Sequence, residues 1–197
     1  MDPLAVLAAF VAIFPAELPD KTMFASMVLT ARTGHPRAVW VGATAAFAVH
    51  AAIAVALGRV LHLLPETVVA LVTAAMFFGG AALLLREGSE VDEDAEPAAG
   101  GLSPRDHGRI VARAAFVVVF VAEWGDLTQV TTAGLAARTG SPLSVWLGAL
   151  LALSSVAAIA VTAGQAVMRV LPVGVVRRVA AAVFVTLGVL SLVGLAT

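Results

Sequence analysis

Long hydrophobic stretches separated by short polar segments dominate this chain. The stretches cover about residues 3–31, 38–60, 67–85, 110–137, 143–170 and 175–196. Each one reaches the length of about 18 residues that marks a transmembrane helix. Turn-forming residues such as Gly34 and Pro36 separate neighbouring stretches. The pattern predicts an all-α membrane protein with six transmembrane helices.

Composition narrows the class of protein further. Hydrophobic residues make up 60% of the chain and charged residues 13%, with a mean hydropathy of +0.99. Soluble domains average about 25% charged residues, so a soluble protein is excluded and the lipid bilayer is the expected surrounding. The charged residues are sparse and nearly balanced, with a net charge of -1, so they do not indicate a nucleic-acid partner. The absence of cysteine excludes disulfide bonds, thiolate metal sites and thiol catalysis.

The two halves of the chain repeat one another. A single offset places Phe14-Pro-Ala-Glu17 on Phe120-Val-Ala-Glu123, and nearly half of the positions from Phe14 to Gly58 are then identical. Alanine and valine are common in both halves and would match by chance, but many matched residues are of other types. Such pairs include Asp20 with Asp126, Thr22 with Thr128, Trp40 with Trp146, and Ala31-Arg-Thr-Gly34 with Ala137-Arg-Thr-Gly140. We therefore expect a first three-helix unit over residues 1–86, a linker over 87–108 and a second unit over 109–197.

Three spans per unit make the second unit enter the membrane from the opposite side to the first. Inverted repeats of this kind are typical of secondary transporters, whose sites lie near the membrane midplane on broken helices. Most basic residues follow the first, third and fifth stretches, namely Arg32, Arg37, Arg86, Arg105, Arg109, Arg113, Arg169, Arg177 and Arg178. The opposite face carries only Arg59 and Arg138. The positive-inside rule therefore predicts a cell-membrane protein with a cytoplasmic central loop and both termini outside.

The N-terminus and the central loop each carry a further expectation. Met1 is followed by an apolar run without the basic segment of a signal peptide, so we take it as the start of the first helix. The central loop is acidic from Glu87 to Glu96. A solvated linker is the simpler interpretation, and weak capture of cytoplasmic metal ions is the alternative.

Each unit carries two acidic residues inside its first hydrophobic stretch. They are Glu17 and Asp20 in the first unit, and Glu123 and Asp126 in the second. An ionised carboxylate at the bilayer centre costs about 2.5–3.5 kcal/mol even on a lenient scale, so such residues are functional by default. Because the acids of each pair are three residues apart, they share one helix face. An inverted pair of helices then directs four carboxylates at one another.

Four neighbouring carboxylates need protons or a cation to offset their repulsion. Carboxylate oxygens suit Ca²⁺, Mn²⁺ or Mg²⁺, with support from Thr22, Thr128, Gln129 and backbone carbonyls. A site that holds either protons or metal is the basis of a cation/proton exchanger, which is no enzyme and needs no cofactor.

The motif-bearing stretches are also expected to break or kink. As one straight helix, residues 3–31 would measure about 43 Å, against about 30 Å for the hydrocarbon core. Pro19 lacks a backbone donor, and Gly125 at the matching place is conformationally permissive. We therefore predict unwound backbone at both motifs.

Further residues near the motifs have competing interpretations. His50 is a candidate proton relay, or a hydrogen-bonded packing residue. Lys21 either offsets part of the acidic charge or extends to an interface. Met23 is a soft ligand that favours Mn²⁺, or a packing residue. Trp40 and Trp146 are expected to be interfacial anchors.

The doubled Glu-x-x-Asp-x-Thr motif, in a protein of two times three helices, resembles uncharacterised protein family 0016, the Gdt1/TMEM165 family of cation exchangers. The resemblance implies transport of Mn²⁺ and/or Ca²⁺ coupled to protons. It also implies roles for the four acids and for the hydroxyls of Thr22 and Thr128. Two residues depart from the family's pattern, because Pro19 replaces a glycine and Leu127 a basic residue.

Three other functions compete with export of a divalent cation by exchange for protons. An exporter of another small cationic substrate would carry the same repeats. A passive channel would ignore a proton gradient. An intramembrane aspartyl protease would need Asp20 and Asp126 to share a proton, and it leaves Glu17 and Glu123 without a role. The sequence leaves the oligomeric state open, a homodimer included.

Overall fold

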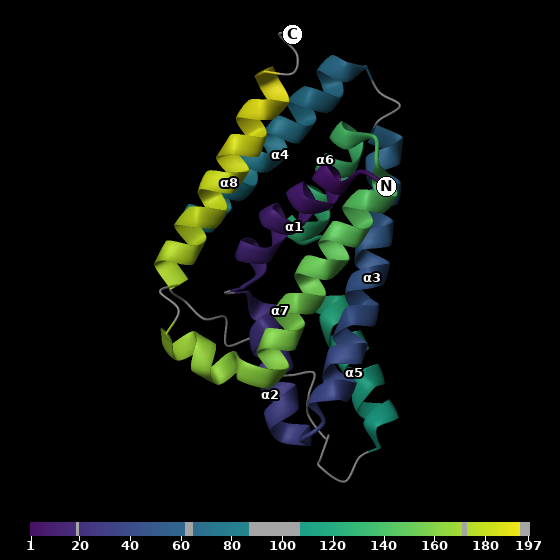
Figure 1. The fold of residues 1–197 in the computed structure, drawn as a ribbon, viewed down its shortest axis with the longest axis vertical. Helices are drawn as coiled ribbons and strands as arrows, with labels where there is room; N and C mark the ends of the chain where they lie inside the picture. The colour runs from purple at the N-terminus through teal and green to yellow at the C-terminus, as the bar shows by residue number, and fades with distance from the viewer. Residues whose placement is uncertain (19, 62–64, 87–106, 171–172, 194–197) are drawn as a thin grey trace.

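The computed structural model describes all residues except 19, 62–64, 87–106, 171–172 and 194–197 (Figure 1). Within the described ranges helices are the only regular secondary structure. Its helices are α1 (Pro3–Glu17), α2 (Lys21–Thr33), α3 (Pro36–Leu61), α4 (Glu66–Arg86), α5 (Gly108–Ala122), α6 (Leu127–Thr139), α7 (Pro142–Val170) and α8 (Val173–Val193). The predicted all-α class is confirmed.

The expected breaks occur at both acidic motifs. The first stretch is divided into α1, which ends at Glu17, and α2, which begins at Lys21, with a bend of 66° between them. The fourth stretch is divided in the same way into α5 and α6. In Figure 1, α1 and α6 lie in one half of the long axis and α2 and α5 in the other. The two breaks therefore face one another near the middle of the molecule.

The repeated Arg-Thr-Gly-x-Pro segment explains where the half-helices stop and the long helices start. Gly34 follows α2 with φ 67° and Gly140 follows α6 with φ 60°. Glycine adopts this left-handed conformation without a Cβ penalty, and it is the common residue after a helix C-terminus. The next proline begins α3 or α7, a position where its missing N–H costs no hydrogen bond.

Two of the described helices are long and apolar enough to cross a membrane on length and composition alone. They contain the segments Pro36–Val60 and Pro142–Ala163, and the bent α1–α2 pair adds a third if it counts as one span. Shorter apolar helical segments cover Thr67–Ala82 and Arg178–Val193. Large apolar side chains, such as Leu7, are exposed on the outer faces of the helices. The number of spans remains a prediction, and so does the inverted arrangement.

Helix contacts between the halves recur with the same offset as the sequence. The glycine Gly42 of α3 lies against Ala112 and Ala115 of α5, and the matching Gly148 of α7 lies against the backbone of Val6 in α1 and the side chain of Ala9. The absent side chain lets each pair of backbones approach closely, as is common between helices in membranes.

Two tryptophans join the long helices to one another. The indole N–H of Trp40 donates to the carbonyl oxygen of Ser154 at 2.9 Å, and that of Trp146 donates to Ala48 at 3.0 Å. Since these partners also match under the offset, α3 and α7 are tied by two equivalent hydrogen bonds. Both indoles thus have a packing role, while their interfacial position remains a prediction.

The outer helices α4 and α8 lie side by side along one edge (Figure 1). Phe77 and Phe184 meet there edge to face, with ring centroids 5.8 Å apart.

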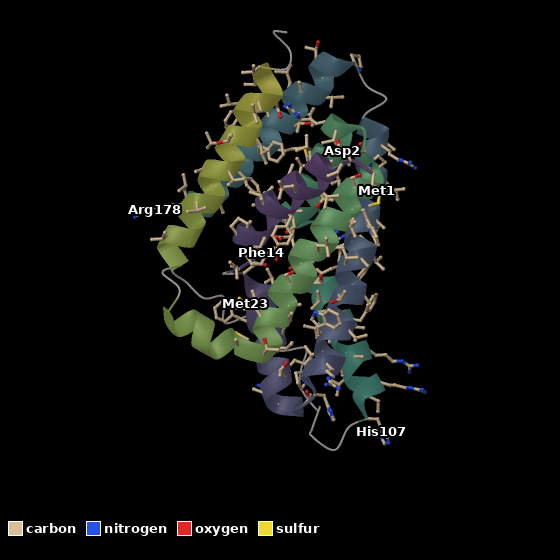
Figure 2. The ribbon with its side chains drawn as sticks, in the orientation of Figure 1. Met1, Asp2, Phe14, Met23, His107 and Arg178 are labelled. Carbon is tan, nitrogen blue, oxygen red and sulfur yellow. The ribbon has the colours of Figure 1, made fainter. Side chains whose placement is uncertain are left out.

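The linker predicted over residues 87–108 falls between the end of α4 at Arg86 and the start of the second half. Its residues 87–106 lie outside the described residues, and α5 begins at Gly108. Figure 2 labels Phe14 and Met23 near the middle of the long axis, close to the first break.

Candidate metal centre

The helix breaks place each acid at a helix end. Glu17 is the last residue of α1, and Asp20 directly precedes α2. Glu123 directly follows α5, and Asp126 directly precedes α6. Aspartate is favoured before a helix because the helix N-terminus carries a partial positive charge. Neither aspartate side chain caps its own helix.

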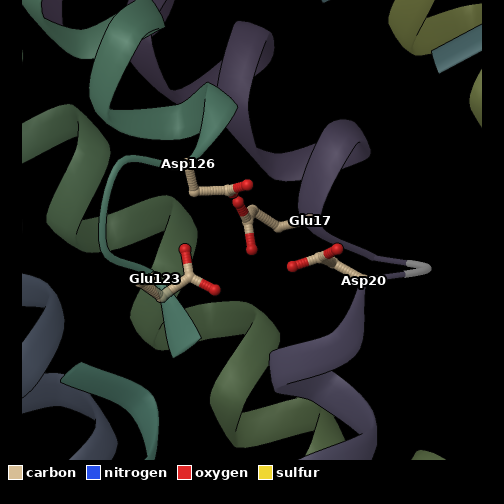
Figure 3. Close-up of side chains that lie close together, drawn as sticks. All are labelled: Glu17, Asp20, Glu123 and Asp126. Carbon is tan, nitrogen blue, oxygen red and sulfur yellow. The ribbon is translucent and has the colours of Figure 1, made fainter. Parts of the chain in front are cut away.

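The second break contains a turn that only a flexible residue adopts easily. Gly125 has φ 77°, in the left-handed region. A hydrogen bond from the N–H of Asp126 to the carbonyl oxygen of Glu123 at 3.2 Å closes this turn between α5 and α6, and both carboxylates point into the same cluster (Figure 3). Pro19, the residue to which the first break was attributed, lies outside the described residues.

Four carboxylates converge where the two breaks meet (Figure 3). One oxygen from each of Glu17, Asp20, Glu123 and Asp126 lies within 4.8 Å of all the others. Glu17 and Glu123 are each 3% exposed, and the two aspartates are half-buried. The structure therefore brings together all four acids that the sequence proposed, two from each repeat.

The threonines of the motifs differ in their contacts. Thr128 donates its hydroxyl to Glu17 of the other repeat, and it lies 3.2 Å from Asp126. The matching hydroxyl of Thr22 is buried with no hydrogen-bond partner among the described residues. The second carboxylate oxygen of Glu17 is in the same situation. Buried oxygens without a partner are costly, and a cation placed among the acids would give the Glu17 oxygen a partner.

His50 and Gln129 lie beside the second motif and contact each other. The His50 ring bonds through Nε2 to the carbonyl of Phe120 at 2.9 Å, and through Nδ1 to the side-chain amide of Gln129. The carbonyl oxygen of that amide accepts from the N–H of Gly125 at 3.1 Å. A small cavity beside Glu123 is lined by both residues. The sequence nominated them separately, as a proton relay and an ion ligand, and gave no sign that they form a pair.

The remaining nominated residues lie at the edge of the site. Met23 is buried in an apolar cluster with Val156 and Ala160, which matches the packing interpretation. Lys21 begins α2, but its side chain lies outside the described set. The carbonyl of Phe120 was not predicted as part of the site; it becomes available because α5 ends two residues later. The break expected at Gly125 was the signal that could have found it.

A helical chain with apolar spans and a buried cluster of four carboxylates defines a membrane protein that handles a cation. The chain matches the family described as "Divalent cation/proton antiporter GDT1" over residues 5–92 and again over 111–197. It therefore belongs to the GDT1 family of divalent cation/proton antiporters. These proteins are transporters and not enzymes, so the protease interpretation is set aside.

Individual relatives agree with this assignment. The chain is 34% identical over 180 residues to "Protein PAM71, chloroplastic" of Arabidopsis thaliana, covering 80% of this chain and 48% of the relative. It is 34% identical over 176 residues to "GDT1-like protein sll0615" of Synechocystis, covering 82% and 83%. A third relative, "GDT1-like protein 1, chloroplastic" of Oryza sativa subsp. indica, is 30% identical over 94% of this chain and 61% of its own length. The chain thus spans about half the length of the first relative. No solved structure matches it.

Proposed function

We propose that this chain is a secondary transporter that exports Mn²⁺ and/or Ca²⁺ from the cytoplasm in exchange for protons. The observation that supports this proposal is the convergence of four carboxylates from two repeats, with ligand oxygens within 4.8 Å of one another. Glu17, Asp20, Glu123 and Asp126 are the proposed metal ligands. The matched hydroxyls of Thr22 and Thr128 support them.

The chemistry of the donor set favours a hard divalent cation. Among the described residues the cluster consists of carboxylates, without the histidine or cysteine ligands that zinc and copper prefer. Ca²⁺ takes about six to eight oxygen ligands, more than the four acids supply with one oxygen each. The hydroxyl of Thr22 and backbone carbonyls at the two breaks complete the set.

Competition between protons and the metal ion for the same site couples proton movement to metal export. Four carboxylates this close repel one another, so the site is stable only when protons or a metal ion offset their charge. A metal ion entering the protonated site displaces protons, and protons entering from the other side displace the metal. Lys21 is proposed to offset part of the charge of the first motif. For His50 the two roles that the sequence allows are a proton relay and a hydrogen-bonded packing residue.

Alternating access follows from the proposed topology. Residues 1–86 and 109–197 form two inverted three-helix units with six spans in total, and the acidic linker 87–108 lies in the cytoplasm with the termini outside the cell membrane. The broken helices and the helix contacts that recur with the sequence offset support this arrangement. The site then lies between the two units, where a relative movement exposes it to either side.

Inside-out vesicles test the proposal directly. With an acidic lumen, vesicles that contain the wild-type protein are expected to take up Mn²⁺ or Ca²⁺, and the uptake is expected to collapse with the proton gradient. Asp20→Asn and Asp126→Asn should each reduce uptake at least tenfold, because the amide keeps the shape of the side chain but loses its charge. Asp2→Asn is a matched control, since Asp2 caps α1 away from the site and asparagine caps equally well.

The result also separates the competing functions. Normal uptake by both motif variants would contradict the four-carboxylate site. Uptake that ignores the proton gradient would indicate a channel. A cationic metabolite that moves faster than either metal, and is not displaced by them, would indicate another substrate.

A further inference from the structure

A continuous chain of hydrogen bonds clamps the second acidic motif. It runs from the N–H of Gly125 to Oε1 of Gln129, from the Gln129 amide to Nδ1 of His50, and from Nε2 of His50 to the carbonyl oxygen of Phe120. Because Nδ1 accepts from the amide, the proton of the neutral ring is on Nε2, which donates to the carbonyl. Every polar side-chain atom in this chain therefore has a partner.

The helix break creates the need for this chain. The last carbonyls of a helix have no partner within it, and the N–H of Trp124 turns to Val121 at 3.4 Å and not to Phe120. The carbonyl of Phe120 is thus left for another donor, which His50 of α3 supplies at 2.9 Å. The ring of His50 also packs on that of Phe120, with centroids 4.6 Å apart. His50 therefore holds the end of α5, which immediately precedes Glu123.

Gln129 completes the clamp on the other side of the turn. It lies in the first turn of α6, directly after Asp126 and Thr128. Its amide joins the Gly125 backbone to the imidazole of His50. The clamp thus fixes the backbone on both sides of Glu123 and Asp126 to the long helix α3, without using either carboxylate.

The first motif has apolar residues at all the matching positions. Under the repeat offset, Gln129 corresponds to Met23, His50 to Val156, Phe120 to Phe14 and Trp124 to Leu18. These residues form an apolar cluster in which Met23 and Val156 are buried and Phe14 and Leu18 pack against them. Apolar contacts are non-directional, so this cluster holds the first motif without prescribing a hydrogen-bond geometry.

We propose that Gln129 and His50 are positioning residues that make the second motif the fixed half of the ion site. The first motif, which has no such clamp, is the half that moves when the ion enters or leaves. This assignment gives Gln129 a role other than ion ligand and gives His50 a role that needs no change of protonation. It rests on the proposed function for the ion site and for the choice of Mn²⁺ as the transported probe.

The repeat itself supplies the test substitutions. His50→Val and Gln129→Met each install the residue found at the matching place in the other half. Each is expected to raise the KM for Mn²⁺ uptake about tenfold, with a much smaller change in maximal rate, because the carboxylates remain but are no longer held in place. The double variant should be no worse than either single variant, since breaking either link removes the same chain.

Two controls separate positioning from packing and from proton transfer. His50→Gln keeps an acceptor for Gln129 and a donor for Phe120 but cannot carry a proton at neutral pH, so its KM should stay near that of the wild type. Val49→Ala, at an exposed apolar residue beside His50 on α3, should also leave KM unchanged. If His50→Gln is as impaired as His50→Val, the clamp is wrong.

Hydrogen–deuterium exchange of the purified protein tests the clamp without transport. Peptides covering residues 120–130 should exchange more slowly than those covering 14–24 in the wild type and in His50→Gln, and should lose this protection in His50→Val. If the wild type moves no Mn²⁺ but this contrast is present, the proposed function fails and the clamp stands. Equal exchange of the two segments, or the same exchange in all variants, would overturn the clamp.

Discussion

The hydroxyl of Thr128 donates to the carboxylate of Glu17, although the two residues belong to different repeats. Thr128 also lies 3.2 Å from Asp126 in its own motif. One hydroxyl therefore links acids from both halves of the chain. The matching Thr22 has no hydrogen-bond partner among the described residues. The two halves of the site are related by sequence but differ in their hydrogen bonds.

This link predicts that loss of the Thr128 hydroxyl impairs transport. In Thr128→Val the buried Glu17 loses a hydrogen bond, and such bonds to charged groups contribute about 1.5–3 kcal/mol. We expect the KM for Mn²⁺ uptake to rise at least tenfold, while Thr128→Ser stays close to the wild type. Initial rates over a range of Mn²⁺ concentrations measure the effect.

Thr186→Val is the control for that substitution. Thr186 is exposed on α8, and its hydroxyl donates to the carbonyl oxygen of Ala182 one turn earlier. Its replacement should not change transport. Equal loss in the Thr186 and Thr128 variants would mean that the Thr128–Glu17 bond is not the cause.

The close approach of the repeats predicts a matched pair of destabilising substitutions. A Cβ at Gly42 would overlap the carbonyl oxygen of Ala112, and a Cβ at Gly148 would overlap that of Val6. Overpacking of this kind costs about 1–3 kcal/mol. Gly42→Ala and Gly148→Ala should therefore lower the melting temperature in detergent by similar amounts.

Gly79→Ala is the control for the glycine contacts. A Cβ at Gly79 meets nothing within 4 Å, and alanine is favoured over glycine in a helix by about 1 kcal/mol. This variant should be as stable as the wild type or more stable. A drop in melting temperature equal to that of Gly42→Ala would show that the close approach does not explain the loss.

The carboxylate cluster predicts stabilisation by the transported ion. A ligand that binds only the folded state at 100 times its Kd contributes about 2.7 kcal/mol to stability. Adding Mn²⁺ to the purified wild-type protein should therefore raise its melting temperature, and removal with a chelator should reverse the shift. Glu17→Gln should show little shift, because it lacks one of the four charges.

The same measurement separates specific from general metal effects. Asp2→Asn, with its substitution outside the cluster, should respond to Mn²⁺ as the wild type does. A shift that is unchanged in Glu17→Gln would place the bound ion elsewhere on the chain.

Local features of the fold were predictable because they depend on neighbouring residues. The Arg-Thr-Gly-x-Pro segments mark helix ends through the conformational freedom of glycine and the missing N–H of proline. Gly125 marks a break for the same kind of reason. The number of spans was less accessible, because the apolar segments of α4 and α8 and the half-helices are shorter than those of α3 and α7.

Contacts between distant segments could not be predicted in the same way. Nothing near Trp40 in the chain indicates that its indole donates to Ser154, and nothing near His50 indicates its contacts with Phe120 and Gln129. Such contacts depend on how helices are rotated and packed against one another. His50 was predicted to be a proton relay or a hydrogen-bonded packing residue, and Gln129 an ion ligand, without that information.

The sequence by itself determined the helical class, the repeat and the identity of the four acids. Hydropathy, internal repetition and acidic residues inside apolar stretches can all be read from the order of the residues alone. Only the tertiary structure decided that one oxygen from each acid lies within 4.8 Å of the others. It also decided that the second motif has a hydrogen-bonded clamp where the first has an apolar cluster. The physical reason is that local propensity ends and starts helices, whereas the packing of distant helices sets which side chains meet.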